Sequence, residues 1–269
     1  VQVGPRPEMR EWREKPEATG IVASLIADIN IRHKFEDCID IPENAVRTVY
    51  TTLPKTIMDQ YHELKDESIL FTDQHGGIVN AIHAGVRVKK LLQLVTGAIY
   101  DEHGDVHKIH TERYELVMDL VEARDHSLVA FNWKHERNEL CYIASKRKLR
   151  YAVIDGDVTS NARRTEIVRA FQAGELDVLF CHPQSAAHGL TLTRARTTIW
   201  CSPTYNAEHF QQFNRRIYRA TQTAKTETIL VTAVGTWEEE VYARLNTKLS
   251  RMDELLGILS TLTLYKEAS

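Results

Sequence analysis

Hydrophobic residues follow two different periods along this chain, and the change between them comes near residue 126. Before it, apolar positions mostly recur every three to four residues, as in amphipathic helices. The helices predicted in this part are 17–29, 55–67, 81–97 and 111–124. Two patterns interrupt them: an alternating run that predicts a strand ending near Pro54, and two short runs about a turn that predict a hairpin over 98–110.

After residue 126, short apolar runs alternate with helical patterns. The strands predicted in this part are 127–133, 150–156, 177–182, 197–203 and 227–234, and the helices are 134–145, 160–174, 206–220 and 236–259. This alternation is typical of a parallel sheet with crossover helices on its faces, so the sequence predicts an α/β fold. We therefore expect a loose arm over 1–16, a mostly helical region over 17–126 and an α/β lobe over 127–269.

Composition indicates a folded globular chain, because 43% of its 269 residues are hydrophobic and 26% are charged. Cys38, Cys141, Cys181 and Cys201 form no CxxC pair. This spacing argues against a structural zinc site, and scattered unpaired cysteines favour a reducing cytoplasm. No apolar run approaches the roughly 20 residues that a membrane-spanning helix needs, so no membrane partner is expected.

The formal net charge of −3 is the sum of two unlike parts. Residues 128–235 hold 15 Lys and Arg against 9 Asp and Glu, whereas the rest holds 19 against 28. The net charge of +6 over residues 128–235 coincides with the α/β part of the chain, where we expect phosphates to bind.

Two familiar nucleotide-binding loops are absent from the sequence. None of the 12 glycines is followed by Lys, so there is no Walker A loop, and no GxGxxG pattern occurs. The turn at Asp101-Glu102 resembles a Walker B strand end, but without a phosphate loop we interpret it as a solvated turn. His103, His107 and His110 have a spacing that suits a metal on a helix, yet Gly104 interrupts that periodicity, so no metal site is expected.

The candidate chemistry lies within residues 182–222. Small residues, including Ser185 and Gly189, follow a buried strand at its carboxyl end, where open α/β sheets bind ligands. A tight strand-to-helix turn explains them equally well. Farther along, Gln212, Arg216 and Arg219 fall at i, i+4 and i+7, which predicts one shared helix face.

Arginines on one face suit phosphate oxygens, because the planar guanidinium donates two parallel hydrogen bonds. A surface ion-pair cluster is the alternative, although only Glu208 lies nearby in the sequence to neutralise the charge. From its position on the predicted helix, Arg215 points elsewhere.

Five segments resemble, in order, the motifs of the second RecA-like lobe of superfamily-two helicases and translocases, specifically the Swi/Snf-like branch. Within the second segment, Asp155, Gly156, Arg163 and Phe171 stand at matching places. The His-Pro and His-Gly-Leu variant in the third segment is most similar to phage and prokaryotic members. The five segments are SLVAFNWKHERNEL, VIDGDVTSNARRTEIVRAF, LFCHPQSAAHGLTLTRA, QFNRRIYRATQ and ETILVTAVGTWEEEVYARL.

The resemblance implies a RecA-like fold and a role in ATP hydrolysis between two lobes, with ATP and Mg²⁺ as cofactors. It implies that Arg216 and Arg219 act on ATP, with Gly189 and Gln212 lining the site. It also implies a DNA-facing surface, made of Trp133, Lys134, Arg163, Ser185, His188 and Thr191. The region over 17–126 resembles the variable segment that joins the two lobes.

The partners expected from this resemblance are DNA, duplex or single-stranded, and the first RecA-like lobe of a parent helicase in a bacterial or phage-infected cytoplasm. Because the Walker A and B motifs are absent, we expect this chain alone to be inactive as an ATPase. A second hypothesis is a non-catalytic module, a stand-alone lobe that docks nucleic acid or a protein. A doubly wound sheet with unrelated small-molecule chemistry is a third, and it leaves the arginine spacing unexplained.

Overall fold

A computed structural model describes residues 15, 17–26, 29, 40–75, 78–100, 103–186 and 189–267. The arm predicted over 1–16 lies, apart from residue 15, outside the described residues, as does Cys38.

The elements before residue 126 are α1 (Ala18–Ile26), β1 (Asn44–Thr51), α3 (Lys55–His75), α4 (Ile78–Val95), β2 (Ala98–Tyr100), β3 (Val106–Lys108) and α5 (Glu112–Glu122). Those after it are β4 (Ser127–Ala130), α6 (Lys134–Lys146), β5 (Tyr151–Ile154), α7 (Asn161–Gln172), β6 (Val178–Cys181), α8 (Pro183–Ala186), β7 (Thr197–Trp200), α9 (Ala207–Asn214), β8 (Thr226–Ala233) and α10 (Trp237–Glu267). The predicted hairpin is confirmed, because β2 and β3 pair antiparallel.

The main sheet has six strands in the order β1-β8-β7-β4-β6-β5, and every pair in it is parallel. The α/β prediction is therefore confirmed. The predicted strand before Pro54 is β1, which pairs with β8 over its whole length. Residues 44–51 thus complete the sheet formed by strands after residue 126, a pairing that the sequence did not predict.

Alternate residues of the strands point to opposite faces, and each face has its own hydrophobic core. In β4, Leu128 packs against the core that α7, α9 and α10 cover, whereas Val129 packs against the core that α5 and α6 cover. All four β4 residues are buried. Burial on both faces explains why the strands read as continuous apolar runs rather than as alternating ones.

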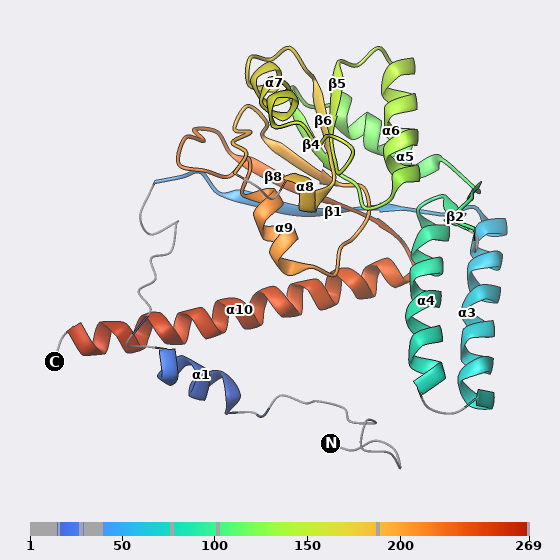
Figure 1. Ribbon diagram of the computed structural model, residues 1–269, viewed down its shortest axis with the longest axis horizontal. Helices are drawn as coiled ribbons and strands as arrows, with labels where there is room; N and C mark the ends of the chain where they lie inside the picture. The colour runs from blue at the N-terminus through green and yellow to red at the C-terminus, as the bar shows by residue number, and fades with distance from the viewer. Residues whose placement is uncertain are drawn as a thin grey trace.

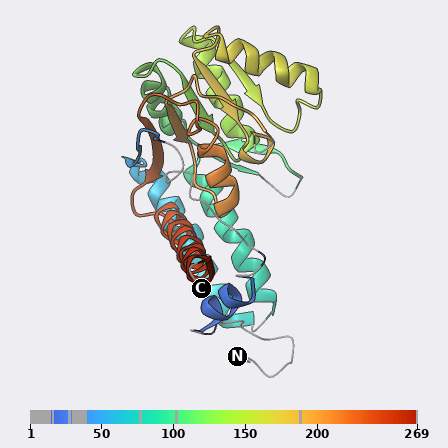
Figure 2. The ribbon, with the colours of Figure 1, turned by 90° about the vertical axis from the view of Figure 1, so that its left-hand side faces the viewer.

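Helices α3 and α4 form a hairpin beside the sheet, and α10 passes beneath the sheet toward α1 (Figure 1). A view from the side shows α4 and α10 extending from the same end of the sheet domain (Figure 2). A third core joins these parts, formed by residues of α3 and α4 with Ala233 of β8. The Tyr61 hydroxyl accepts a hydrogen bond from the backbone N–H of Trp237 at 2.8 Å, which attaches α3 to the start of α10. No helix among the described residues has the length and apolar character needed to cross a bilayer.

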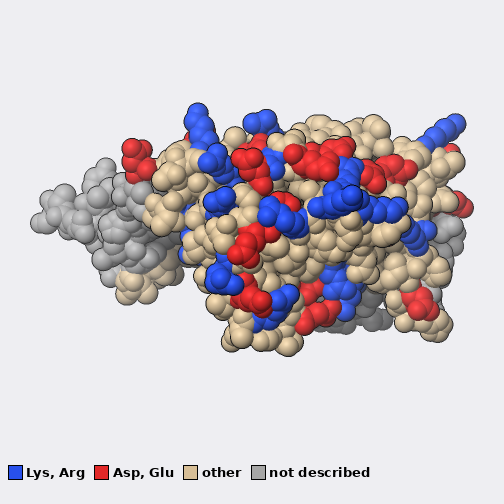
Figure 3. Space-filling model, turned by 90° about the horizontal axis from the view of Figure 1, so that it is seen from above, with Lys and Arg blue, Asp and Glu red and all other residues tan. Residues whose placement is uncertain are grey.

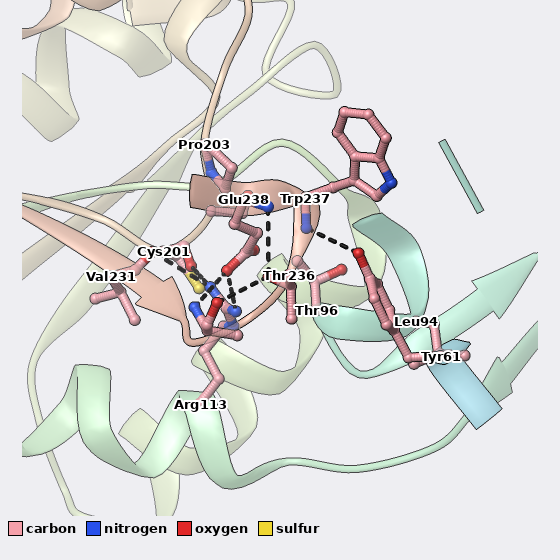
Figure 4. A network of polar contacts seen from close by, with 12 residues as sticks. Tyr61, Leu94, Thr96, Arg113, Cys201, Pro203, Val231, Thr236, Trp237 and Glu238 are labelled. Carbon is pink, nitrogen blue, oxygen red and sulfur yellow. Dashed lines mark hydrogen bonds and ion pairs between the residues drawn. The ribbon is translucent and has the colours of Figure 1, made fainter. Parts of the chain in front are cut away.

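A fully buried ion pair between Arg113 and Glu238 connects α5 to the first turn of α10 (Figure 4). Arg113 Nη2 lies 2.6 Å from Glu238 Oε2, and Nη1 donates to the carbonyl oxygen of Cys201 at 2.7 Å. Glu238 Oε2 also accepts from the backbone N–H of Ala233 at 2.8 Å. These contacts tie two helices to the carboxyl ends of β7 and β8.

Glu136 is a second buried carboxylate, in the first turn of α6. Its Oε2 accepts from the backbone N–H groups of Asn132 at 2.6 Å and Trp133 at 3.0 Å, so it caps the helix. Complete burial raises the pKa of Glu136 from 4.5 to about 7, although these hydrogen bonds and Arg113 oppose the change.

We expect Glu238→Ala to lower the free energy of unfolding by about 3–5 kcal/mol, because it leaves the Arg113 guanidinium buried without its carboxylate. Urea unfolding followed by circular dichroism measures the change. Glu240→Ala is the control: it removes an exposed pair with Arg244, and we expect a loss below about 1 kcal/mol. Equal losses from the two substitutions would contradict the role assigned to the buried pair.

Glu136 also predicts a pH dependence of stability. Between pH 4.5 and about 7 the folded chain binds more protons at Glu136 than the unfolded chain does, so this carboxyl stabilises the fold at low pH and loses that effect as pH rises through 7. We expect the unfolding free energy of wild type, relative to Glu136→Gln, to fall by about 3 kcal/mol from pH 4.5 to pH 8. Chemical denaturation at each pH measures it. Glu175→Gln, on the exposed loop before β6, serves as the control, and a similar curve for both variants would refute the assignment.

Candidate functional site

Two motif segments meet in the structure: the one between β6 and β7 and the one between β7 and β8. They meet because both return from the carboxyl edge of the sheet to its amino edge. Since β6 and β7 are parallel, the segment between them must travel back to the amino end of β7, and α9 likewise leads back to the amino end of β8. The returns contact each other directly. The backbone N–H of Leu192 donates to the carbonyl oxygen of Arg216 at 2.9 Å, and Arg216 Nη1 donates to the carbonyl oxygen of Leu190 at 3.3 Å.

Arg216 and Arg219 lie together beside this contact. Arg219 Nη1 donates to the Thr191 hydroxyl at 3.1 Å, and its Nε donates to the carbonyl oxygen of Arg215 at 3.2 Å. Arg216 is 6% exposed. Burial, and then the charge of Arg219, lower the pKa of Arg216 below its ordinary value. The site therefore concentrates positive charge where little water solvates it, an environment that favours an anion.

The predicted helix over 206–220 is too long. The prediction that Gln212, Arg216 and Arg219 share one helix face is therefore wrong. Helix α9 ends at Asn214, with Arg215 as its C-cap, and the two arginines stand in the turns that follow. The Asn214 side-chain oxygen accepts from Thr198 Oγ1 at 2.8 Å and from Trp200 Nε1 at 3.1 Å, which fixes the helix end over β7. Gln212 stays on α9 and donates to Glu208 at 2.8 Å.

The small residues after β6 occupy two environments. Ser185 lies in the short helix α8, and its carbonyl oxygen accepts from Arg164 Nη1 at 3.5 Å. Gly189 is exposed with a φ of +64°, a backbone conformation that side chains rarely adopt, and open space surrounds the position of a Cβ. His188 lies outside the described residues.

Trp133 and Lys134 lie at the amino end of α6, at the carboxyl edge of the sheet. The Trp133 ring stacks on His135 with centroids 6.4 Å apart, and Lys89 Nζ lies 5.7 Å from its centroid. Lys134 is exposed and lies 3.9 Å from Asp157. The structure therefore places these two residues apart from the arginine site, near the loop that follows β5.

Arg163 projects from α7 and forms an exposed pair with Glu166 at 2.6 Å. Of the residues that organise the loop after β5, the sequence singled out Asp155 but missed Arg137, Asp157 and Arg164. Arg137 bridges Asp155 and Asp157 at 2.6 Å each, and Arg164 donates to the carbonyl oxygen of Val158 at 2.7 Å.

Gln222 was also missed as a structural residue. It is buried, and its Nε2 donates to the carbonyl oxygens of Thr193, Ala195 and Ile217 at 3.1–3.2 Å. One side chain thus fastens the segment before β7 to the turn that carries the arginines. Its place at the end of the QFNRRIYRATQ segment was the available signal.

His110, one of the three histidines considered for a metal, makes two contacts within the protein. His110 Nε2 hydrogen-bonds the carbonyl oxygen of Leu94 at 3.0 Å, and its Nδ1 lies 3.0 Å from Glu112. The part of the chain that the structure describes holds no group of three or more His, Cys, Asp or Glu suited to a metal. Asp101 and Glu102 lie outside it.

Figure 3 shows the sheet domain from above, with Lys and Arg interspersed among Asp and Glu. The net positive charge of residues 128–235 is therefore partly paired on the surface. Arg147, for example, contacts Asp119 and Glu122 at 2.7 Å each as well as Glu115.

Comparison with known proteins agrees with this architecture. Residues 112–221 match the family described as helicase conserved C-terminal domain. Over 240 residues the chain is 27% identical to "Putative protein p41" of Acyrthosiphon pisum secondary endosymbiont phage 1, covering 86% of this chain and 49% of that protein. Over 267 residues it is 22% identical to "DNA excision repair protein ERCC-6-like" of Danio rerio, covering 93% of this chain and 18% of that protein. The chain thus spans about half or less of the length of these relatives.

Two solved structures share the fold. The C-terminal part of the Fun30 ATPase domain has a TM-score of 0.59 at 12% identity, and the match covers 76% of this chain and 89% of that one. The Sulfolobus solfataricus SWI2/SNF2 ATPase C-terminal domain has a TM-score of 0.58 at 16% identity, with coverages of 77% and 87%. The expected RecA-like fold is therefore confirmed. Residues 112–221 of this chain are thus similar to the helicase conserved C-terminal domain, and its fold is similar to the folds of these two ATPase C-terminal domains.

Proposed function

We propose that this chain is the second motor lobe of an ATP-dependent DNA helicase or translocase, and that it supplies Arg216 and Arg219 to an ATP site. The phosphate-binding half of that site, with the carboxylates that hold Mg²⁺, would lie on a first lobe. The observation that carries the proposal is the contact between the two motif segments, which gathers two guanidinium groups beside Leu190 and Thr191.

The charge of the arginine site suits a triphosphate. Burial and a neighbouring like charge both disfavour the charged form of Arg216, and an anion between the guanidinium groups would relieve that repulsion. Among the described residues, no carboxylate forms an ion pair with Arg219. Gly189 has no side chain to obstruct a phosphate that approaches the loop.

When ATP is bound, it supplies the γ-phosphoryl group that is transferred to water. The chain's own residues position charge against that group. Thr191 and the carbonyl oxygen of Arg215 orient Arg219, and the carbonyl oxygen of Leu190 orients Arg216. Guanidinium groups held in place before the reaction stabilise the charge that develops on phosphate oxygens, an effect worth ~10³–10⁵ in rate in phosphoryl transfer. Gln212 would line the same site from α9.

DNA would contact the six residues that the resemblance assigns to it, which are Trp133, Lys134, Arg163, Ser185, His188 and Thr191. Lys134 and Arg163 support this role, because their side chains are 73% and 60% exposed. Thr191 would connect the two sites, since its hydroxyl holds Arg219. Opening and closing of the two lobes would then move this lobe along the DNA backbone, a contact that carries little sequence information.

A non-catalytic module that docks nucleic acid or a protein is the second candidate. The exposed side chains of Lys134 and Arg163 favour it, because they suit such docking without any ATP site. The two functions differ in one measurable respect, because only the motor lobe supports ATP hydrolysis when a first lobe is present.

We expect no ATP turnover from the 269-residue chain alone, and turnover when it is joined to a first lobe with a Gly-Lys-Thr loop and Asp-Glu carboxylates. In the joined protein, Arg219→Ala should lower kcat by about 10³-fold, because a charge that stabilises the transferring phosphoryl group is lost. Phosphate release measures the rate.

Arg215→Ala is the matched control for that experiment. It removes an exposed arginine four residues away but keeps the backbone carbonyl that orients Arg219, so we expect kcat to change less than about threefold. Equal losses from the two substitutions, or Arg219-dependent turnover by the isolated chain, would overturn the proposal.

A further inference from the structure

A polar groove of about 1180 Å³ runs along the amino-terminal ends of the strands. Its lining includes residues at or just before the start of all six strands of the main sheet, from Glu43 before β1 to Arg150 before β5. This surface is distinct from the proposed DNA-facing residues near Trp133 and Ser185, which follow strand carboxyl ends. It adjoins the arginine site, because Gln222 lines the groove and also holds the carbonyl oxygen of Ile217.

Part of the positive charge in the groove is neutralised within it. Arg124 Nε lies 2.5 Å from Glu227 Oε1, and Arg47 Nη2 lies 3.5 Å from Glu227 Oε2. Arg150 pairs with Asp177, and its Nε lies 3.2 Å from both carboxylate oxygens. These pairs use three of the six cations in the lining and two of its four carboxylates.

Three cations, Arg194, Arg196 and Lys225, stand outside those pairs. Within the described residues, their side chains make no hydrogen bond or ion pair. Arg194 is nevertheless placed by packing: its Nη2 lies 2.9 Å from the point where Gly174 would carry a Cβ, so the guanidinium rests on the glycine backbone. Its backbone N–H also donates to Gln172 at 2.9 Å, which fixes the segment that presents it.

The lining fits phosphates better than a protein surface. It contains threonine hydroxyls and charged groups but no Val, Leu, Ile, Met, Phe, Tyr or Trp among the described residues. Protein interfaces depend on aromatic and apolar anchors, which this groove lacks. Arginine, lysine and threonine side chains are the usual donors to the phosphate oxygens of nucleic acids.

The extent of the groove favours a polymer over a single nucleotide. Neighbouring strands lie about 4.8 Å apart, so six strands span about 24 Å. One chain of a DNA duplex carries about seven phosphates over a length of about 24 Å. A nucleotide would leave most of it empty.

We propose that this groove is a second binding surface for the nucleic-acid backbone, with Arg194, Arg196 and Lys225 as its phosphate contacts. The inference shares with the proposed function only the class of partner, nucleic acid, and requires no ATP site. The duplex would lie across the amino ends of the strands, next to the turn that carries Arg216 and Arg219.

The test measures binding of the 269-residue chain to fluorescent duplex DNA over 50–200 mM salt. We expect Arg194→Gln/Arg196→Gln/Lys225→Gln to weaken binding at least about tenfold at 50 mM and to reduce the slope of log K against log salt by about 2.7, the value for three lost phosphate contacts. Lys55→Gln/Lys146→Gln/Lys248→Gln is the control. It removes the same charge from α3, α6 and α10, outside the groove, and should change the slope by less than about 1.

Circular dichroism melts test whether both triple variants fold. If the groove triple variant does not fold, the single variant Arg194→Gln replaces it, with an expected slope change of about 0.9. Equal slope changes for groove and control variants would overturn the proposal. So would competition by polyglutamate as strong as that by DNA at equal charge, which indicates an acidic protein partner, or loss of tripolyphosphate binding alone, which indicates a free phosphate site.

A Trp133→Ala/Lys134→Gln variant separates this inference from the proposed function. If it weakens DNA binding and the groove variant does not, the groove fails and the proposed DNA-facing residues stand. If Arg219→Ala leaves ATP turnover unchanged in the joined protein while the groove variant still reduces the slope, the motor-lobe proposal fails and the groove stands.

Discussion

The buried ion pair between Arg113 and Glu238 is the constraint from which the rest of the arrangement follows. Two charges without water are stable only in contact with each other and with further hydrogen-bond partners, which Cys201 and Ala233 provide through their backbones. The pair and its hydrogen bonds therefore join α5, β7, β8 and α10 at one point. The same region receives α3 through Tyr61, so the helices before the sheet are attached where the sheet's central strands end.

Once the sheet is fixed as parallel, the position of the arginine site follows from topology. Every connection between parallel strands must return to the amino edge, and the two returns that flank β7 lie next to each other. Asn214 ends α9 over β7, and Gln222 then binds the segment before β7 to the turn after α9. The arginines are therefore presented by a short turn held at both ends, rather than by a helix face.

The sequence predicted what depends on local pattern and missed what depends on distant partners. The runs around Leu128 and Phe180 are apolar on both faces, which marks a central parallel strand whatever the neighbours are. By contrast, the 206–220 pattern remains helical in period past Asn214, whereas the helix ends there, where the Asn214 side chain bonds Thr198 and Trp200. The pairing of β1 with β8 and the partnership of Arg113 with Glu238 join residues more than 100 positions apart, and neither has a signal in spacing.

The segment from Gly189 to Arg196 belongs to both surfaces discussed above, and this has a mechanical consequence. At one end Thr191 holds Arg219; at the other, Arg194 and Arg196 line the groove, and Gln222 fixes the carbonyls of Thr193 and Ala195 between them. A displacement of the arginine turn must therefore shift this segment or break the buried hydrogen bonds of Gln222, which is costly in a dry environment. In the proposed motor lobe, charge changes at the nucleotide would reach a DNA-contacting surface through the hydrogen bonds of Arg219 and Gln222 with this segment, without any change in the sheet.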